Sequence, residues 1–101
     1  MTLGELIKFL KSKDRKKIVP LGFDNPHSYR GYYEELAFEP ALNISVEEML
    51  DCAKEALGNT YEGYKGGIYK MGNSTDVWLA EYGHCGESIG PILLKYMLGE
   101  I

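Results

Sequence analysis

The sequence predicts an α+β fold, in which a small antiparallel sheet of four to five strands packs with three helices. The chain has 101 residues, enough for one hydrophobic core, so residues 1–101 are expected to form a single domain. Three segments have apolar residues at helical spacing, and five have the composition of short strands. These elements follow one another in the order α-β-β-α-β-β-β-α, which is typical of the α+β class.

The predicted helices cover residues 2–13, 46–57 and 89–99. The first two begin with the spacing of a capping box, in which two residues three apart satisfy each other's backbone N–H groups. These pairs are Thr2 with Glu5 and Ser45 with Glu48. Gly58 suits a left-handed end to the second helix, and Pro91 suits the first turn of the third. The buried face of the third helix is predicted to consist of Ile89, Ile92, Leu93, Tyr96 and Met97.

The predicted strands cover residues 18–23, 34–39, 60–64, 68–71 and 76–82. Pro20 cannot donate to a strand ladder, so the first strand is expected at an edge of the sheet or as an extended lead-in. Turns are expected at residues 24–27 and at 72–74, the second as the turn of a hairpin. The last strand is mostly apolar on both faces, which indicates a central position in the sheet, and we expect Trp78 to be a core residue.

Composition and charge exclude several classes of function. Fifteen acidic residues outweigh 11 basic ones, for a formal net charge of −4, whereas proteins that bind nucleic-acid polymers usually carry the opposite balance. The basic residues between 11 and 17 are expected to be a solvated helix end. No apolar run approaches the roughly 20 residues that span a bilayer, and no secretory signal is visible. We therefore expect a cytoplasmic protein that contacts neither membranes nor nucleic-acid polymers.

Residues 27–33 carry the side chains that nucleotide recognition requires. Arg30 offers a bidentate fork for a phosphate, and the neighbouring rings offer flat faces for a purine. The ligand-binding candidates in this segment are His27, Ser28, Tyr29, Arg30 and Tyr32. An edge strand with cross-strand tyrosine pairs and a structural salt bridge at Arg30 explains the segment equally well.

Two further loops are candidate ligand sites, with His84, Glu87 and Ser88 in one and Tyr64 and Lys65 in the other. The first loop opens the last helix, and backbone N–H groups at a helix start bind anions. Ser88 is expected to cap that helix or to donate to a phosphate, and Glu87 to accept from a ribose hydroxyl. Lys65 lies in a glycine-rich segment and is expected to meet a phosphate, although the spacing of a P-loop is absent.

Catalysis has weaker support than binding. His27 and His84 form an acid–base pair only if the fold brings them together, and Cys85 beside His84 is a candidate nucleophile. The sequence offers no third orienting residue and no metal-ligand spacing, and its two cysteines are too few for a disulfide scaffold. We therefore expect a binding protein with no catalytic residue, metal or cofactor.

Several blocks of the sequence resemble a family of small proteins encoded by bacteriophages. They are the segment from Gly22 to Pro40 with its SYRGYY and ELAFEP blocks, residues 63–67, the VWxAEYG block of residues 77–83, and residues 89–91. The blocks occur in order across residues 18–98, which is nearly the whole domain.

Small phage proteins with a polar and aromatic pocket are similar to the sponges that sequester immune nucleotide signals. The resemblance implies a viral anti-defence protein in the cytoplasm of the bacterial host. It would bind an ADP-ribose-type or cyclic oligonucleotide signal of Thoeris or CBASS defence without cleaving it. Two alternatives stay open: an enzyme that cleaves the signal through His27 or His84, and a module whose tyrosines block a host protein. An edge strand also allows the domain to form a homo-oligomer.

Arg30 provides a test of the nucleotide hypothesis. If its guanidinium holds a phosphate, Arg30→Ala abolishes nucleotide binding and leaves the melting temperature unchanged. Arg30→Lys keeps the charge but loses the fork, so it also weakens binding. A thermal-shift panel of ADP-ribose derivatives and cyclic dinucleotides measures both effects, because a ligand at about 100 times its dissociation constant adds about 2.7 kcal/mol of stability. Binding that neither substitution changes would refute this role.

Overall fold

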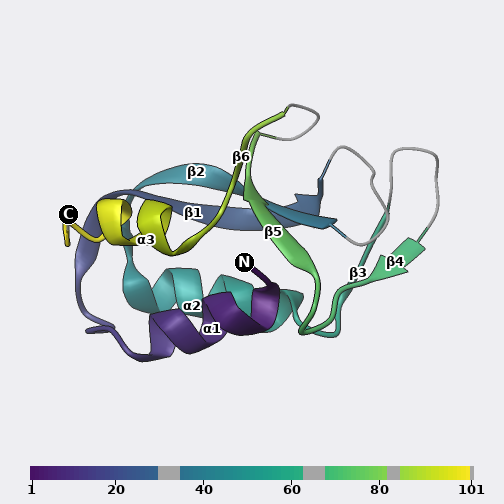
Figure 1. The fold of residues 1–101 in the computed structure, drawn as a ribbon, viewed down its shortest axis with the longest axis horizontal. Coiled ribbons are helices and arrows are strands. Elements are labelled where there is room, and N and C mark those ends of the chain that lie inside the picture. The colour runs from purple at the N-terminus through teal and green to yellow at the C-terminus, as the bar shows by residue number, and fades with distance from the viewer. Residues whose placement is uncertain (30–34, 63–67, 82–84, 101) are drawn as a thin grey trace.

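Three helices and six strands form the part of the chain that the computed structural model describes, residues 1–29, 35–62, 68–81 and 85–100 (Figure 1). The elements are α1 (Leu3–Lys11), β1 (Ile18–Ser28), β2 (Glu35–Ser45), α2 (Val46–Ala56), β3 (Thr60–Glu62), β4 (Ile68–Lys70), β5 (Asp76–Leu79), β6 (Glu87–Ser88) and α3 (Pro91–Met97). The predicted α+β class is confirmed. None of the helices in these ranges has the length and apolar character needed to cross a membrane.

The main sheet has four strands in the order β1-β2-β5-β6, and β3 and β4 pair in a separate two-stranded sheet. β1 is an edge strand and β5 is central, as the sequence predicts. β2 is antiparallel to β1 but parallel to β5, so the main sheet is mixed rather than antiparallel throughout. Because α2 and the β3–β4 pair connect β2 to β5 along the chain (Figure 1), this connection has the length that parallel neighbours require.

The main core lies between the β1–β2 pair and the helices α1 and α2 (Figure 1). Phe23 of β1 and Phe38 of β2 are fully buried there, with ring centroids 4.6 Å apart. Leu36 and Ala37 are also fully buried. Since consecutive strand residues point to opposite faces, β2 is covered on both sides.

Both predicted N-cap residues are confirmed, and α1 has the complete capping box. Thr2 Oγ1 accepts a hydrogen bond from the Glu5 N–H at 3.3 Å, and Glu5 Oε1 accepts one from the Thr2 N–H at 3.0 Å. The bond that the Thr2 N–H donates to the Glu5 carboxyl, together with one from the Thr2 side chain, lowers the pKa of that carboxyl because both favour its charged form. Ser45 Oγ accepts from the Glu48 N–H at 3.1 Å at the start of α2. Gly58 follows α2 with a φ of 82°, in the left-handed region.

The turn predicted at residues 24–27 is wrong, because β1 continues through these residues. Its register with β2 shifts between Asp24 and His27, which marks a β-bulge. Asn25 has a φ of 45°, a conformation that asparagine tolerates better than most residues. The turn-like composition therefore specifies a bend within a strand.

The second predicted turn is present but does not close a hairpin. The Thr75 N–H donates to the Gly72 carbonyl at 3.2 Å. The turn joins β4 to β5, which belong to different sheets.

The residues that follow β5 are anchored to the N-terminus: the Met1 amino group donates a hydrogen bond to the Ile89 carbonyl at 3.0 Å.

The last helix begins later than predicted. Residues 87–88 form the short strand β6 beside β5, and α3 begins after Gly90, its N-cap residue. Ser88 therefore does not cap the helix. Glu87 and Ser88 belong to the sheet, and their predicted contacts with a ribose hydroxyl and a phosphate stay predictions.

The predicted buried face of α3 is wrong in part. Ile92 and Tyr96 are 77% and 70% exposed, whereas Leu94 and Leu98 are buried. Apolar residues occur on more than one side of this segment, so helical spacing alone does not determine which side packs. Packing against β1 and the main core selects the side with Leu94 and Leu98.

Two of the basic residues that follow α1 hold the C-terminal segment instead of being only solvated. Lys13 Nζ forms a salt bridge with Glu100 at 2.9 Å, and Lys17 Nζ donates to the Leu98 carbonyl. These contacts attach the end of α3 to the loop between α1 and β1.

Gly22 of β1 lies where the sheet packs closely on α2. A Cβ at this position would lie 2.4 Å from Ile44 Cγ2 and 2.7 Å from Met49 Sδ. We expect Gly22→Ala to lower the free energy of unfolding by about 1–3 kcal/mol through overpacking. The control Gly72→Ala adds a Cβ with no atom within 4 Å and should change it by less than about 0.5 kcal/mol. Urea unfolding followed by circular dichroism compares the two, and equal stabilities would contradict the packing.

Candidate functional site

A stacked pair of aromatic rings, Tyr29 and Trp78, lies at the centre of the candidate site. Tyr29 follows β1, and Trp78 belongs to β5, two strands away in the sheet. Tyr29, Ala37 of the intervening β2 and Ala80 form a small buried cluster that is separate from the main core, and Trp78 packs against it. Because Ala37 carries only a methyl group, the two rings meet over it, with centroids 4.4 Å apart and an interplanar angle of 5°.

A row of side chains crosses the sheet through this cluster. In the strand register, His27 pairs with Ala37, Ala37 with Trp78, and Trp78 with Ser88. Directly paired residues point to the same face of a sheet, so all four lie on one face. We call His27, Trp78 and Ser88, together with Tyr29, the aromatic row.

Two segments predicted to bind a ligand meet at Tyr29. Its Oη accepts a hydrogen bond from the Gly86 N–H at 3.3 Å, across 57 residues of chain. Gly86 is needed here because a Cβ would lie 1.8 Å from the Leu79 carbonyl oxygen. The sequence predicts both segments as ligand-binding but does not predict that they touch.

Trp78 has an unsatisfied polar atom. Its Nε1 is buried, and no described residue accepts a hydrogen bond from it. A buried donor without an acceptor lowers the free energy of unfolding by about 1–3 kcal/mol. Trp78 itself is half-buried, so it lies at the margin of the small cluster rather than in the main core.

The remaining described candidates are divided between the two faces. His27 is buried in the aromatic row, and its Nδ1 lies 3.1 Å from the Asn25 carbonyl oxygen. Because a carbonyl oxygen can only accept a hydrogen bond, Nδ1 carries the proton. Ser28 is buried and pairs with Leu36, on the opposite face. Glu87 pairs with Leu79, which also places it opposite the aromatic row.

Half of the predicted ligand-binding residues lie outside the described part of the chain. These residues are Arg30, Tyr32, Tyr64, Lys65 and His84. Their predicted contacts with a phosphate or a base, and an acid–base pair of His27 with His84, stay predictions. Among residues 1–29, 35–62, 68–81 and 85–100, no three His, Cys, Asp or Glu side chains lie close enough to hold a metal ion.

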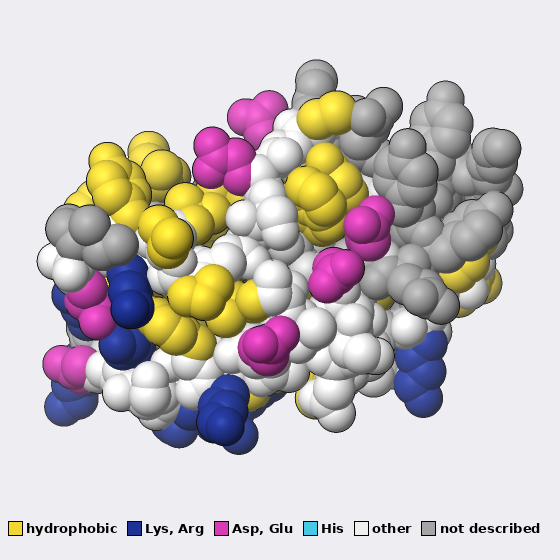
Figure 2. Space-filling model, in the orientation of Figure 1, with side chains coloured by type: hydrophobic (Ala, Val, Ile, Leu, Met, Phe, Trp, Pro, Cys, Tyr) yellow, Lys and Arg dark blue, Asp and Glu magenta, His cyan; other side chains and the backbone are white. Residues whose placement is uncertain are grey.

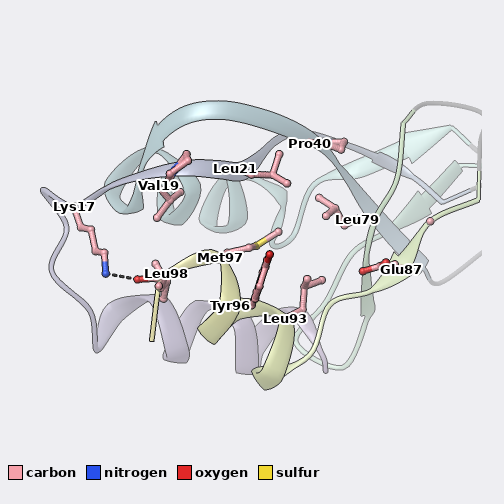
Figure 3. Close-up of a pocket in the computed structure, with 13 residues that line it drawn as sticks. Lys17, Val19, Leu21, Pro40, Leu79, Glu87, Leu93, Tyr96, Met97 and Leu98 are labelled. Atoms are coloured by element: carbon pink, nitrogen blue, oxygen red, sulfur yellow. Dashed lines mark hydrogen bonds between the residues drawn. The ribbon is translucent and has the colours of Figure 1, made fainter. Parts of the chain in front are cut away.

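An apolar groove of about 870 Å³ lies between α3 and the sheet (Figure 3). The sheet contributes Val19, Pro20, Leu21, Pro40 and Leu79, and the C-terminal segment contributes Leu93, Tyr96, Met97, Leu98 and Gly99. Lys17 and Glu87 lie at its two ends (Figure 3). Of the residues that line the groove, the sequence predicts only Glu87 as a ligand-binding residue, because apolar residues at helical or strand spacing are expected in a hydrophobic core. The signal that could have found the groove is the surplus of apolar residues in α3.

The two cysteines differ in environment. Cys52 of α2 is half-buried against the main core, and burial, together with the carboxylate of Asp24, raises the pKa of its thiol. Cys85 is exposed and precedes Gly86, at the edge of the aromatic row.

No protein-family model, curated protein or solved structure matches this chain. The candidate site therefore rests on the geometry described above.

The contact between Tyr29 and Gly86 can be separated from the ring stack by substitution. Tyr29→Phe keeps the stack and removes the hydroxyl acceptor, so we expect the free energy of unfolding to fall by about 0.5–1.5 kcal/mol. The emission of Trp78, the single tryptophan of the chain, should stay unchanged. Tyr29→Leu also removes the stack and should shift this emission. Identical emission spectra for the two variants would show that the rings are not stacked in solution.

Proposed function

We propose that this protein binds a small nucleotide-derived signal without cleaving it, and that the aromatic row receives the base of the ligand. The observation that carries the proposal is the position of Tyr29, which stacks on Trp78 and accepts a hydrogen bond from Gly86. Two segments with nucleotide-binding chemistry are thereby joined into one surface. The role as a phage anti-defence sponge rests in addition on the sequence resemblance.

The aromatic row suits a base for two reasons. Stacking of a base on an aromatic side chain contributes about 1–3 kcal/mol, and the half-buried Trp78 retains accessible surface. A base or phosphate also carries the acceptor that the indole N–H lacks among the described residues. A ligand that reached this atom would relieve the cost of its burial.

The phosphate is assigned to Arg30, which directly follows Tyr29 in the chain. If its guanidinium reaches the stacked rings, it would hold a phosphate while the base lies on the row. The net charge of −4 disfavours a polymer with many phosphates, but it does not prevent one local contact with a small ligand.

Sequestration needs less of the site than cleavage does. An acid–base catalyst must reach the reacting atoms, whereas His27 is buried and its Nδ1 hydrogen bonds to the Asn25 carbonyl. This arrangement fits an imidazole that holds the bulge of β1 in shape. A bound ligand would then be released unchanged when the protein unfolds.

The experiment combines binding with recovery of the ligand. ADP-ribose derivatives and cyclic di- and trinucleotides are incubated with the protein, and Trp78 fluorescence and the melting temperature are recorded. The protein is then denatured by heat, and the released compound is analysed by chromatography. We expect one class of nucleotide to quench the fluorescence, raise the melting temperature and be recovered intact.

A matched pair of variants tests where the ligand lies. Tyr29→Leu removes the buried ring on which Trp78 stacks, so Trp78 is no longer held in place for the base and the dissociation constant should rise about tenfold or more. Tyr96→Leu, the same substitution in the apolar groove, should leave it unchanged. If wild-type protein yields a cleaved product and His27→Ala or His84→Ala does not, the result would favour the enzyme. If the protein removes no nucleotide from solution, the result would contradict the proposal.

A further inference from the structure

The apolar groove and its borders form a surface that the proposed function does not use. Leu21 and Tyr96 line the groove, and other exposed apolar residues adjoin its lining. The exposed fractions are 57% for Ile18, 43% for Leu21, 76% for Leu42, 77% for Ile92 and 70% for Tyr96. Hydrophobic side chains accordingly gather at the end of the molecule where α3 lies (Figure 2). Contiguous apolar surface of this kind marks an interaction site.

We propose that a second copy of this chain covers the groove and forms a symmetric dimer. The first argument is charge. Lys17 and Glu87 lie at opposite ends of the groove (Figure 3). A two-fold axis through its middle exchanges the ends, so that Lys17 of each copy faces the partner's Glu87. The same surface is therefore electrostatically complementary to itself.

The second argument is shape. Ile92 projects from α3, one helical turn before Tyr96, which lines the groove. The groove that could receive Ile92 of a second copy is bordered by that same helix. A symmetric interface requires projections and hollow on one patch, because each subunit offers the same residues. A foreign partner would have to match both charged ends independently, whereas a copy matches them by symmetry.

The third argument is the sheet edge and the area involved. β1 is an edge strand of 11 residues that supplies three of the groove residues, and edges of this length are commonly covered. A specific interface buries about 800 Å² per partner, which is about one seventh of the 5937 Å² surface of the described chain. An interface of this size has to extend beyond the groove itself onto its apolar borders.

Sedimentation velocity of the full chain tests the dimer with two isoleucine variants. Ile92→Glu places a carboxylate in the interface, whereas Ile68→Glu places one at an equally exposed isoleucine of β4, at the opposite end of the molecule (Figure 1). We expect wild type and Ile68→Glu to have twice the 11.4 kDa mass of the chain. Ile92→Glu should sediment as a monomer, with a dissociation constant raised about 100-fold or more.

Charge reversal tests the two-fold arrangement. Lys17→Glu and Glu87→Lys should each weaken the dimer, and the double variant should restore it because the pair is reversed across the interface. A merely structural role of Lys17, through its bond to the Leu98 carbonyl, would not be rescued by Glu87→Lys at the far end of the groove. Circular dichroism confirms that each variant is folded. A wild-type monomer at all concentrations, or dimerisation unaffected by Ile92→Glu, would overturn the proposal.

Discussion

The register of β2 with its two neighbours is the constraint on which both surfaces of the protein depend. Ala37 aligns with His27 on one side and with Trp78 on the other, and Phe38 aligns with Leu79. Because side chains alternate between faces, a shift of one residue would send Trp78 to the main core and Leu79 to the aromatic row. Burial of β2 on both faces opposes such a shift, since every alternative register would change which side chains are buried.

The two faces of this sheet consequently have different chemistry. One carries the aromatic row with an indole N–H and a phenol, and the other borders an apolar groove with one charge at each end. Gly86 connects the two, because the chain passes so close to the Leu79 carbonyl that no side chain fits. Nucleotide binding and self-association can therefore be tested by substitutions on different faces.

Local signals predicted the features that depend on few neighbouring residues. The capping residues Thr2 and Ser45, and the left-handed Gly58, each act within one turn of helix, so their roles were readable from spacing. The same logic failed at Asn25, because turn-forming residues also permit a bulge inside a strand. It failed at Ile92 and Tyr96, because a segment with apolar residues on several sides has no unique periodic face.

By itself, the sequence determined the α+β class, the starts of the first two helices, the central position of β5 and the kinds of side chain offered to a ligand. Only the tertiary structure decided which of them act together: His27 and Ser88 share a face with Trp78, while Ser28 and Glu87 lie on the other. The parallel pairing of β2 with β5 likewise became apparent only in the assembled sheet. The reason is physical, since strand partners and register depend on contacts between residues far apart in the chain, and local hydrophobic periodicity does not specify them.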